Sequence, residues 1–527
     1  MLRPNSAIKA MALVLALTCC SYARSSGSGT PGVQVQVKSG VLQGDALPEG
    51  GAVFKGVPYA TAPTDDLRWR SPAPVAAWTN VRTAQSYGSP CLQPDQGWNS
   101  SLIATANEDC LYLNVWTPAL KRAARLPVMV WIHGGAFIGG SGTDPMFAGE
   151  ELIKKGVVLV TLNYRLGLFG FLAHPELTRD SAHHSSGNFG LEDQLAALQW
   201  VRENIAAFGG DPAKITLFGQ SAGGMSVTTL LASPLSRGQF RQAIIESGSL
   251  LGGPPVKDLA GAEAMGTEFA GAGGIRGLRD LVAADVMKRF GEYMSTHRDA
   301  RWGPIVDHYA LNDDPAATFR RHEEHAVPLI IGNNAREGFG RIPEEALAGV
   351  LKGFYGVDAE RASVLYGTGA AGPLPIDLVL GSGSAQWLTD STFRCGAVIT
   401  ASRHSVAGSP VYEYQFEQSI PGREADGAAH TYELPYVFGN LLPDGPLAGH
   451  FGAADRDLSN EMTSYWTNFA KHGDPNGPHL PQWPRFDQPS GSYLRLSATL
   501  SGNAVSAVGL RKAQCDLFEM QISKPRS

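Results

Sequence analysis

A serine set among glycines, between two different hydrophobic patterns, is the feature that most constrains how this chain folds. Residues 215–218 form a short apolar run typical of a buried strand, and residues 225–232 are typical of a helix. Residues 219–223 between them read Gly-Gln-Ser-Ala-Gly and match the strand, turn and helix of a nucleophile elbow. The glycines are needed because the turn strains the serine backbone and brings strand and helix too close for side chains. Ser221 is therefore the candidate nucleophile, and the flanking pattern disfavours a glycine-rich loop with an incidental serine.

The hydrophobic pattern around this turn predicts alternating strands and helices. Residues 128–132 and 157–160 are continuous apolar runs, which fit strands buried on both faces of a largely parallel sheet. Between residues 191 and 205, apolar positions recur at helical spacing, and Gly-Gly-Asp-Pro at 209–212 ends the helix. The sequence predicts an α/β fold, a central, mostly parallel sheet flanked by helices, in one catalytic domain over residues 32–523.

Composition excludes several classes of protein. The chain has 527 residues, of which 43% are hydrophobic and 17% charged, a balance that suits a packed globular fold and not disorder. A formal net charge of -6 and the lack of a basic run leave no surplus of Lys and Arg to neutralise phosphates, so we expect no nucleic-acid partner. Nothing in the sequence indicates an oligomeric state.

The N-terminus has the three parts of an export signal. Arg3 and Lys9 accompany an apolar stretch at residues 11–17, and Ser-Tyr-Ala at 21–23 supplies a cleavage site. The stretch is well short of the roughly 20 residues that span a bilayer, so we expect a signal peptide over residues 1–23 and no integral membrane span. Residues 24–31 form a flexible lead-in to a secreted or periplasmic protein. A lipoprotein anchored through the box at residues 17–20 is the alternative.

Cysteine usage fits an oxidising compartment. If Cys19 and Cys20 leave with the signal peptide, an even number of cysteines remains, namely Cys91, Cys110, Cys395 and Cys515. Four cysteines allow three pairings, and four buried free thiols are the alternative. The residues alone therefore leave the pairing open.

Acyl transfer at a serine needs a base, and it needs preorganised N–H donors for the oxyanion that forms. Residues 133–137 read His-Gly-Gly-Ala-Phe and follow an apolar run, as an H-G-G-G type loop does. The predicted donors are the backbone N–H groups of Gly135, Ala136 and Ala222. His133 is not the expected base, because it belongs to this loop and precedes the serine. With thirteen histidines in the chain, spacing alone leaves the base open.

Several further motifs occur in a fixed order along the chain. They are Phe-Lys-Gly-Val-Pro-Tyr-Ala at residues 54–60, Glu-Asp-Cys-Leu-Tyr-Leu-Asn-Val at 108–115, Asn-Tyr-Arg at 163–165, Gly-Leu-Glu-Asp-Gln at 190–194 and the elbow at 219–224. With these motifs the chain resembles the type-B carboxylesterase family, which includes para-nitrobenzyl esterases, animal carboxylesterases and cholinesterases. The resemblance implies an α/β-hydrolase fold with large loop insertions over the active site, and a serine esterase acting on a small-molecule ester. We expect no cofactor and no metal.

The resemblance also implies the remaining site residues. In this family the acid is a glutamate in a turn after a strand, which matches Glu337 in Asn-Ala-Arg-Glu-Gly at residues 334–338. The base precedes a Glu-Leu-Pro-Tyr-Val-Phe-Gly motif, which matches His430. A carboxylate on the far nitrogen fixes the imidazole tautomer and stabilises the imidazolium. The same motifs suggest the disulfides Cys91–Cys110 and Cys395–Cys515 and the ion pairs Arg68–Glu108 and Arg165–Asp193.

The chain departs from the family pattern beside the nucleophile. Many relatives carry Glu there, and the neutral Gln220 disfavours choline esters. Trp98 resembles the loop tryptophan of cholinesterases but lies farther from the second cysteine, so we expect a packed or rim tryptophan.

Two further hypotheses about function compete with a general esterase. One is a non-catalytic adhesion or recognition module, although the intact Ser221, Glu337 and His430 argue against it. The second is a hydrolase that cleaves an amide, a thioester or a carbonate in place of a carboxylic ester. A specialised esterase is included here, one that acts on a xenobiotic or on a natural-product ester such as a fumonisin-type toxin.

Overall fold

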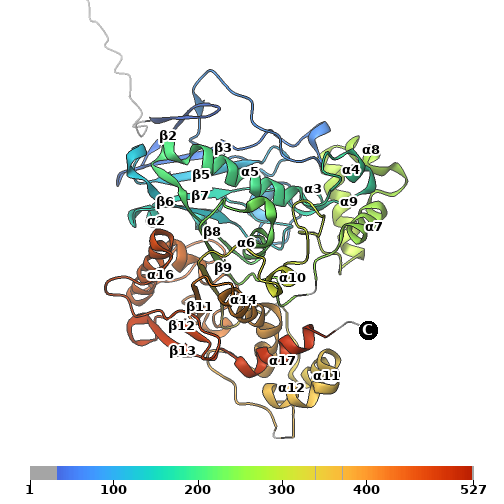
Figure 1. The fold of residues 1–527 in the computed structure, drawn as a ribbon, viewed down its shortest axis with the longest axis vertical. Coiled ribbons are helices and arrows are strands. Elements are labelled where there is room, and N and C mark those ends of the chain that lie inside the picture. The colour runs from blue at the N-terminus through green and yellow to red at the C-terminus, as the bar shows by residue number, and fades with distance from the viewer. Residues whose placement is uncertain (1–31, 254, 339, 371, 525–527) are drawn as a thin grey trace, which may run out of the picture.

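The strands join in one large sheet. The computed structural model describes residues 32–253, 255–338, 340–370 and 372–524. Within these residues lies a 13-stranded sheet of order β1-β2-β3-β5-β7-β6-β8-β9-β10-β11-β12-β13, with β4 paired to β2 (Figure 1). The strands are β1 (Gly32–Val37), β2 (Gly40–Ala46), β3 (Ala52–Pro58), β4 (Arg82–Thr83), β5 (Tyr112–Thr117), β6 (Leu126–Ile132), β7 (Val158–Leu162), β8 (Gly210–Gln220), β9 (Gln242–Glu246), β10 (Leu329–Asn334), β11 (Val411–Phe416), β12 (Ser492–Leu496) and β13 (Ala504–Val508).

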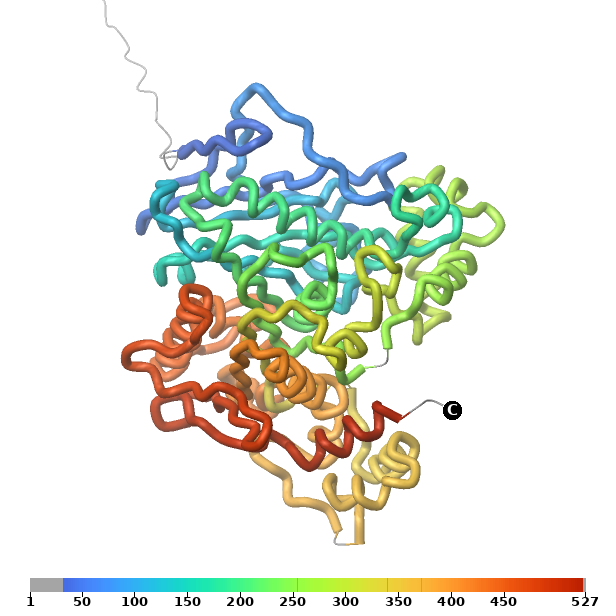
Figure 2. The backbone as a smooth tube through the Cα atoms, in the orientation of Figure 1, coloured from blue at the N-terminus to red at the C-terminus, as the bar shows by residue number. Residues whose placement is uncertain are grey.

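The sheet is parallel in its middle and antiparallel at its ends. From β7 through β12 each neighbouring pair runs parallel. The N-terminal strands β1, β2, β3 and β5 pair antiparallel, as does β13 with β12. In Figure 2 the N-terminal strands lie at one end of the molecule and the C-terminal strands at the other. The parallel middle puts the carboxyl ends of β8, β9 and β10 along one edge, where sites of α/β proteins form.

Helices pack on both faces of the sheet. They are α1 (Ser100–Ile103), α2 (Glu150–Lys154), α3 (Gly167–Phe171), α4 (Pro175–Asp180), α5 (Phe189–Asn204), α6 (Ala222–Ala232), α7 (Leu259–Ala270), α8 (Gly274–Arg279), α9 (Ala283–Thr296), α10 (Pro315–Arg320), α11 (Glu344–Tyr355), α12 (Ala359–Tyr366), α13 (Gly383–Thr389), α14 (Cys395–Val406), α15 (Leu434–Phe438), α16 (Ala453–His472) and α17 (Lys512–Ile522). Along β6, Val128, Val130 and Ile132 join the core under α5 and α6. Met129 and Trp131, between them, join the core under α2, α15 and α16. A strand covered on both faces needs the continuous apolar run seen in the sequence.

The predicted fold class is confirmed. The apolar runs at 128–132, 157–160 and 215–218 lie in β6, β7 and β8, and the pattern at 191–205 coincides with α5. The helix after the elbow begins at Ala222, three residues before the predicted start, because the turn itself supplies its first residues. The predicted signal peptide and lead-in, residues 1–23 and 24–31, lie outside the described residues. In the part of the chain that the structure describes, no helix combines the length and apolar character needed to cross a membrane.

Two disulfides close loops of different length. Cys91 is bonded to Cys110 and Cys395 to Cys515, at sequence separations of 19 and 120. The pairing implied by the resemblance is therefore confirmed. The longer bridge ties the start of α14 to α17 near the C-terminus.

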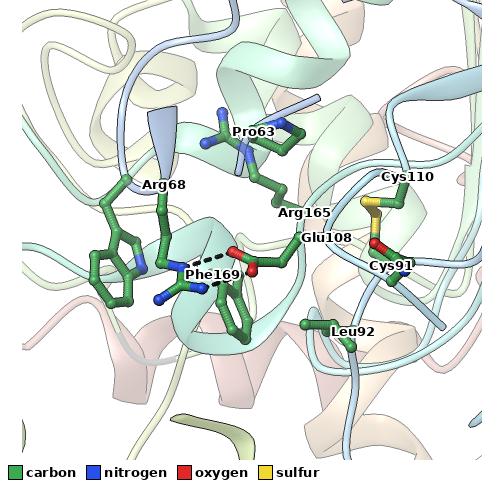
Figure 3. A pocket seen from close by; sticks show the side chains of 10 residues that line it. Pro63, Arg68, Cys91, Leu92, Glu108, Cys110, Arg165 and Phe169 are labelled. Carbon is green, nitrogen blue, oxygen red and sulfur yellow. Dashed lines mark hydrogen bonds and ion pairs between the residues drawn. A yellow bond between two sulfur atoms is a disulfide. The ribbon is translucent and has the colours of Figure 1, made fainter. Parts of the chain in front are cut away.

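Both predicted ion pairs are also present. Arg68 contacts Glu108 at 2.6 Å and Arg165 contacts Asp193 at 2.7 Å, with all four side chains buried or nearly so. Arg68 and Glu108 line a cavity of about 10 Å³. Figure 3 shows both side chains, with the Cys91–Cys110 disulfide at the same pocket. A cavity of that volume has room for one water molecule at most, so we assign these pairs a structural role.

The loop lengths predict how much each disulfide stabilises the fold. Replacing Cys395 and Cys515 by alanine is expected to lower the free energy of unfolding by about 5 kcal/mol, and replacing Cys91 and Cys110 by about 3 kcal/mol, because the longer loop restricts the unfolded chain more. Guanidinium unfolding without reductant measures both losses. A larger loss for the shorter loop would contradict the entropic reasoning.

Candidate active site

Ser221 lies on a strained turn between β8 and α6. Its backbone has φ 55° and ψ -125°, a conformation that a non-glycine residue adopts only when its surroundings enforce it. The backbone N–H of Ser221 donates to the Glu246 carbonyl at the end of β9, at 2.9 Å. A Cβ on Gly223 would lie 2.0 Å from the Ile132 carbonyl oxygen, so only glycine lets α6 approach β6. The turn therefore has the strain and the close packing predicted for a nucleophile elbow.

Glu337 and His430 meet at a short hydrogen bond although 93 positions separate them. His430 Nδ1 lies 2.8 Å from Glu337 Oε2, and the Glu337 side chain is fully buried while that of His430 is 11% exposed. The backbone N–H of Asn334 donates to the other carboxyl oxygen of Glu337 at 2.5 Å. With a carboxylate as its acceptor, Nδ1 is the protonated nitrogen of the neutral ring, and Nε2 is left to accept a proton.

Gln220 connects the elbow to the imidazole. Its side-chain Nε2 lies 3.2 Å from His430 Nε2, so the residue that precedes Ser221 contacts the nitrogen that would act as base. The same amide nitrogen lies 3.5 Å from Nδ1, so the Gln220 amide packs against the imidazole and contacts both of its nitrogens. The turn that carries Ser221 therefore lies next to the imidazole of His430, and Glu337 contacts the same imidazole.

The predicted oxyanion donors belong to two segments around the elbow. Gly135 has φ 111° and Ala136 has φ 54°. Two consecutive residues with positive φ make the loop after β6 turn sharply. A Cβ on Gly134 would lie 3.0 Å from the Ser221 Cβ, which places this loop directly against the candidate nucleophile. Ala222 is the first residue of α6, where backbone N–H groups point out of the helix. Among the described residues, the N–H groups of Gly135, Ala136 and Ala222 donate to no protein acceptor.

His133 is part of the scaffold of this loop. Its ring is buried, stacks on Tyr164 at a centroid distance of 4.6 Å, and contacts the Gly134 carbonyl through Nδ1 at 2.8 Å. Burial lowers the pKa of His133 to about 4, so the ring is neutral throughout the pH range of ordinary enzymes. These contacts agree with the prediction that His133 is not the base.

Trp98 lies against the loop that follows β6. Its side chain is 52% exposed, and its ring edge packs on the backbone of the glycine loop, 3.0 Å from where a Cβ on Gly135 would lie. Trp98 is therefore half exposed and packed on this loop, in agreement with the expectation of a packed or rim tryptophan.

Two buried carboxyls behind the Glu337–His430 pair were not recognised from the sequence. Glu246 ends β9 and accepts from Trp466 Nε1 at 2.7 Å, and Glu433 accepts from the side-chain amide of Asn334. Both are fully buried. Burial raises the pKa of Glu246 to about 8. Burial, and then the neighbouring Glu337 and Glu246, raise the pKa of Glu433 well above its usual range. Glu246 is therefore mainly protonated at neutral pH, and burial favours the neutral form of Glu433 as well. In the sequence, Glu433 is part of the motif that follows His430 and carries no further signal.

Together these groups have the parts needed for acyl transfer. A serine on a strained turn, a histidine oriented by a buried carboxylate and preorganised backbone donors are what nucleophilic attack on a carbonyl requires. The described residues contain no group of three or more His, Cys, Asp and Glu side chains arranged to hold a metal ion.

Comparisons with known proteins agree with this chemistry. The model of the carboxylesterase family matches residues 31–350 and 379–518. A fumonisin B1 esterase of Sphingopyxis macrogoltabida is 38% identical over 450 residues, which cover 82% of this chain and 81% of that protein. The para-nitrobenzyl esterase of Bacillus subtilis (strain 168) is 35% identical over 471 residues, covering 85% of this chain and 91% of that protein.

Solved structures show the same fold. A thermophilic para-nitrobenzyl esterase superposes with a TM-score of 0.79 at 33% identity, covering 92% of this chain and 99% of that chain. The carboxylesterase EST55 of Geobacillus stearothermophilus gives the same TM-score of 0.79, the same identity of 33% and the same coverage of 92% and 99%.

The buried Glu246 makes stability depend on pH. Its folded pKa of about 8 exceeds the ordinary glutamate value. Between these two pH values Glu246 is ionised in the unfolded chain and protonated in the folded one. The stability that it contributes at acidic pH is therefore lost as pH rises toward 8. Glu246→Gln keeps the acceptor for Trp466 and cannot ionise. Its free energy of unfolding, relative to the wild type, is expected to increase between pH 5 and pH 8 by on the order of 3 kcal/mol.

Urea unfolding at several pH values measures this difference. The exposed Glu345→Gln serves as the control and is expected to follow the wild type at every pH. A Glu246→Gln difference that stays constant with pH would show that Glu246 is ionised in the folded protein.

Proposed function

The chain belongs to the carboxylesterase family and is a carboxylic ester hydrolase acting on small-molecule esters, and we propose that it works through a triad of Ser221, His430 and Glu337. The observation that carries the proposal is the buried 2.8 Å contact between Glu337 and His430 beside the strained turn of Ser221. As an ester hydrolase, the chain does not fit the hypothesis of a non-catalytic adhesion module.

The proposed reaction has two halves. In the first, His430 Nε2 takes the hydroxyl proton of Ser221 while Oγ attacks the ester carbonyl carbon, and the oxyanion is stabilised by the N–H groups of Gly135, Ala136 and Ala222. The intermediate collapses, the carbon–oxygen bond to the alcohol breaks, and His430 donates its proton to the leaving alcohol. In the second, water gives a proton to His430 and attacks the acyl carbon. The bond from that carbon to Ser221 Oγ then breaks, His430 returns the proton to Oγ, and the acid leaves. Glu337 stays ionised and stabilises the imidazolium in both halves.

We also propose that the protein is exported. Residues 1–23 would be the signal peptide, residues 24–31 the lead-in and residues 32–523 one catalytic domain. The two disulfides support an oxidising compartment, since such bonds persist in secreted and periplasmic proteins and are rare in the cytosol.

A fumonisin-type ester is a second, narrower candidate for the substrate. It is favoured by the 38% identity to a fumonisin B1 esterase over 82% of this chain. Hydrolysis of fumonisin B1, compared with that of a para-nitrobenzyl ester by wild-type and Ser221→Ala protein, tests this candidate.

Ser221→Ala is expected to abolish covalent labelling by an organophosphonate and to lower ester turnover by at least ~10³-fold, because the nucleophile and the base act as a unit. Mass spectrometry of the labelled protein, with turnover of a para-nitrobenzyl ester, measures both effects. Ser226→Ala, a buried serine of α6 that contacts Gln194, is the control and is expected to label normally. Labelling retained in Ser221→Ala would overturn the nucleophile assignment.

The two candidate histidines are distinguished by a pair of variants. His430→Ala is expected to lower kcat/KM for a neutral ester about as much as Ser221→Ala does, because no other group in the site takes the proton. His133→Ala removes only a ring that supports the glycine loop, so its loss is expected to be at least tenfold smaller. Steady-state measurement of kcat/KM for both variants tests this order. The reverse order would identify His133 as the base.

A further inference from the structure

A π-helical turn lies beside the candidate triad. Helices α13 and α14 are joined by one such turn, η8 (Asp390–Arg394). A π turn adds a residue to a helix, shifts the side-chain register and occurs frequently at functional sites. Here it buries the adjacent side chains of Phe393, 2% exposed, and Arg394, fully buried.

This short segment contacts both the acid and the base. The backbone N–H of Glu337 donates to Thr389 Oγ1 at 2.9 Å, and Arg394 donates to the Ala335 carbonyl at 2.8 Å. The ring of Phe393 stacks on the imidazole of His430 with centroids 4.6 Å apart and planes inclined by 21°. The residues on either side of the Glu337–His430 hydrogen bond are therefore held by one continuous stretch of helix.

We propose that Phe393 is a positioning residue for His430, and that the π turn sets the position of its ring. The inference rests on the proposed role of His430 as the base. A ring stacked at this distance fixes the plane of the imidazole, so that Nδ1 faces Glu337 while Nε2 faces the elbow. When the base takes the proton of Ser221, the face of Phe393 also stabilises the new positive charge, since aromatic faces attract cations.

The π turn is anchored from the C-terminal side of the molecule. Asp390 pairs with Arg394 at 2.5 Å and with Arg511 at 2.8 Å, and it accepts from the Tyr366 hydroxyl at 3.0 Å. The next residue, Cys395, is bonded to Cys515 on α17. A buried carboxylate held by two arginines and a hydroxyl resists displacement, because moving it away from either arginine would leave a buried charge without its partner. This anchoring keeps Phe393 against His430.

Phe393→Leu is the direct test, because leucine keeps most of the volume and removes the aromatic face. We expect kcat to fall about tenfold with KM changed less than about twofold, because the ring acts after substrate has bound. We also expect the acidic limb of the kcat/KM profile to move to lower pH, because the protonated ring loses a favourable contact. The substitution changes no charged or titratable group. Glu337 still contacts His430, Glu433 still interacts with Glu337 and Glu246, and Asp390 and Arg394 still pair within the π turn.

The chain offers a matched control. Phe319 on α10 is fully buried and packs on another histidine, His404, at a centroid distance of 6.0 Å. Phe319→Leu is expected to lower Tm as Phe393→Leu does, while leaving kcat and the pH profile as in the wild type. Phe393→Met, which also fills the space without an aromatic face, replaces Phe393→Leu if the latter does not fold.

Two results would overturn the proposal. One is a Phe393 variant with lowered Tm and wild-type kcat and pH profile, and the other is an equal kinetic change in Phe319→Leu. Both differ from failure of the proposed triad, which appears as labelling in Ser221→Ala or full turnover in His430→Ala.

Discussion

The site depends on the close approach of three backbone segments at the elbow, namely the ends of β6 and β9 and the start of α6. Ser221 has a positive φ, which costs about 1 to 3 kcal/mol for a residue with a side chain. The hydrogen bond from Ser221 to the Glu246 carbonyl and the contact of Gly223 with Ile132 hold that conformation from β9 and β6. Because α6 starts at the next residue, the same close approach also puts the Ala222 N–H beside the serine. The proposed nucleophile and one proposed oxyanion donor are therefore positioned by a single feature of the sheet.

The electrostatics of the site follow from burial. Glu337, Glu433 and Glu246 are close enough to interact, and each is no more than 1% exposed. Three neighbouring buried carboxyls do not ionise together, because each negative charge disfavours the next. Burial raises the pKa of Glu246 to about 8 and that of Glu433 well above its usual range, which favours the neutral form of both. Glu337 is the carboxyl that contacts the imidazole, and the neutral pair adds no competing negative charge behind it.

Local patterns predicted the elbow, the central strands and the helices beside them, because a buried strand and an amphipathic helix leave their period in the sequence. Glu337 and His430 were predicted from the family resemblance, since nothing near either residue indicates contact across 93 positions. The π turn was not predicted, because a single added residue hardly disturbs a helical period. The stacking of Phe393 on His430 and the pairing of Asp390 with Arg511 are long-range contacts that no pattern along the chain indicates.

Gln220, the residue before Ser221, is neutral and contacts the imidazole of His430. Gln220 lies 3.2 Å from His430 Nε2, the nitrogen on which the proton of Ser221 would arrive. A glutamate there would add a second negative charge beside the imidazolium and a fourth carboxyl to a region where burial already raises the pKa of two others. The neutral amide contacts the ring without adding a charge, so Glu337 is the carboxylate that contacts the imidazole. Because Gln220 is neutral, the residue before Ser221 adds no negative field that would attract a cationic substrate.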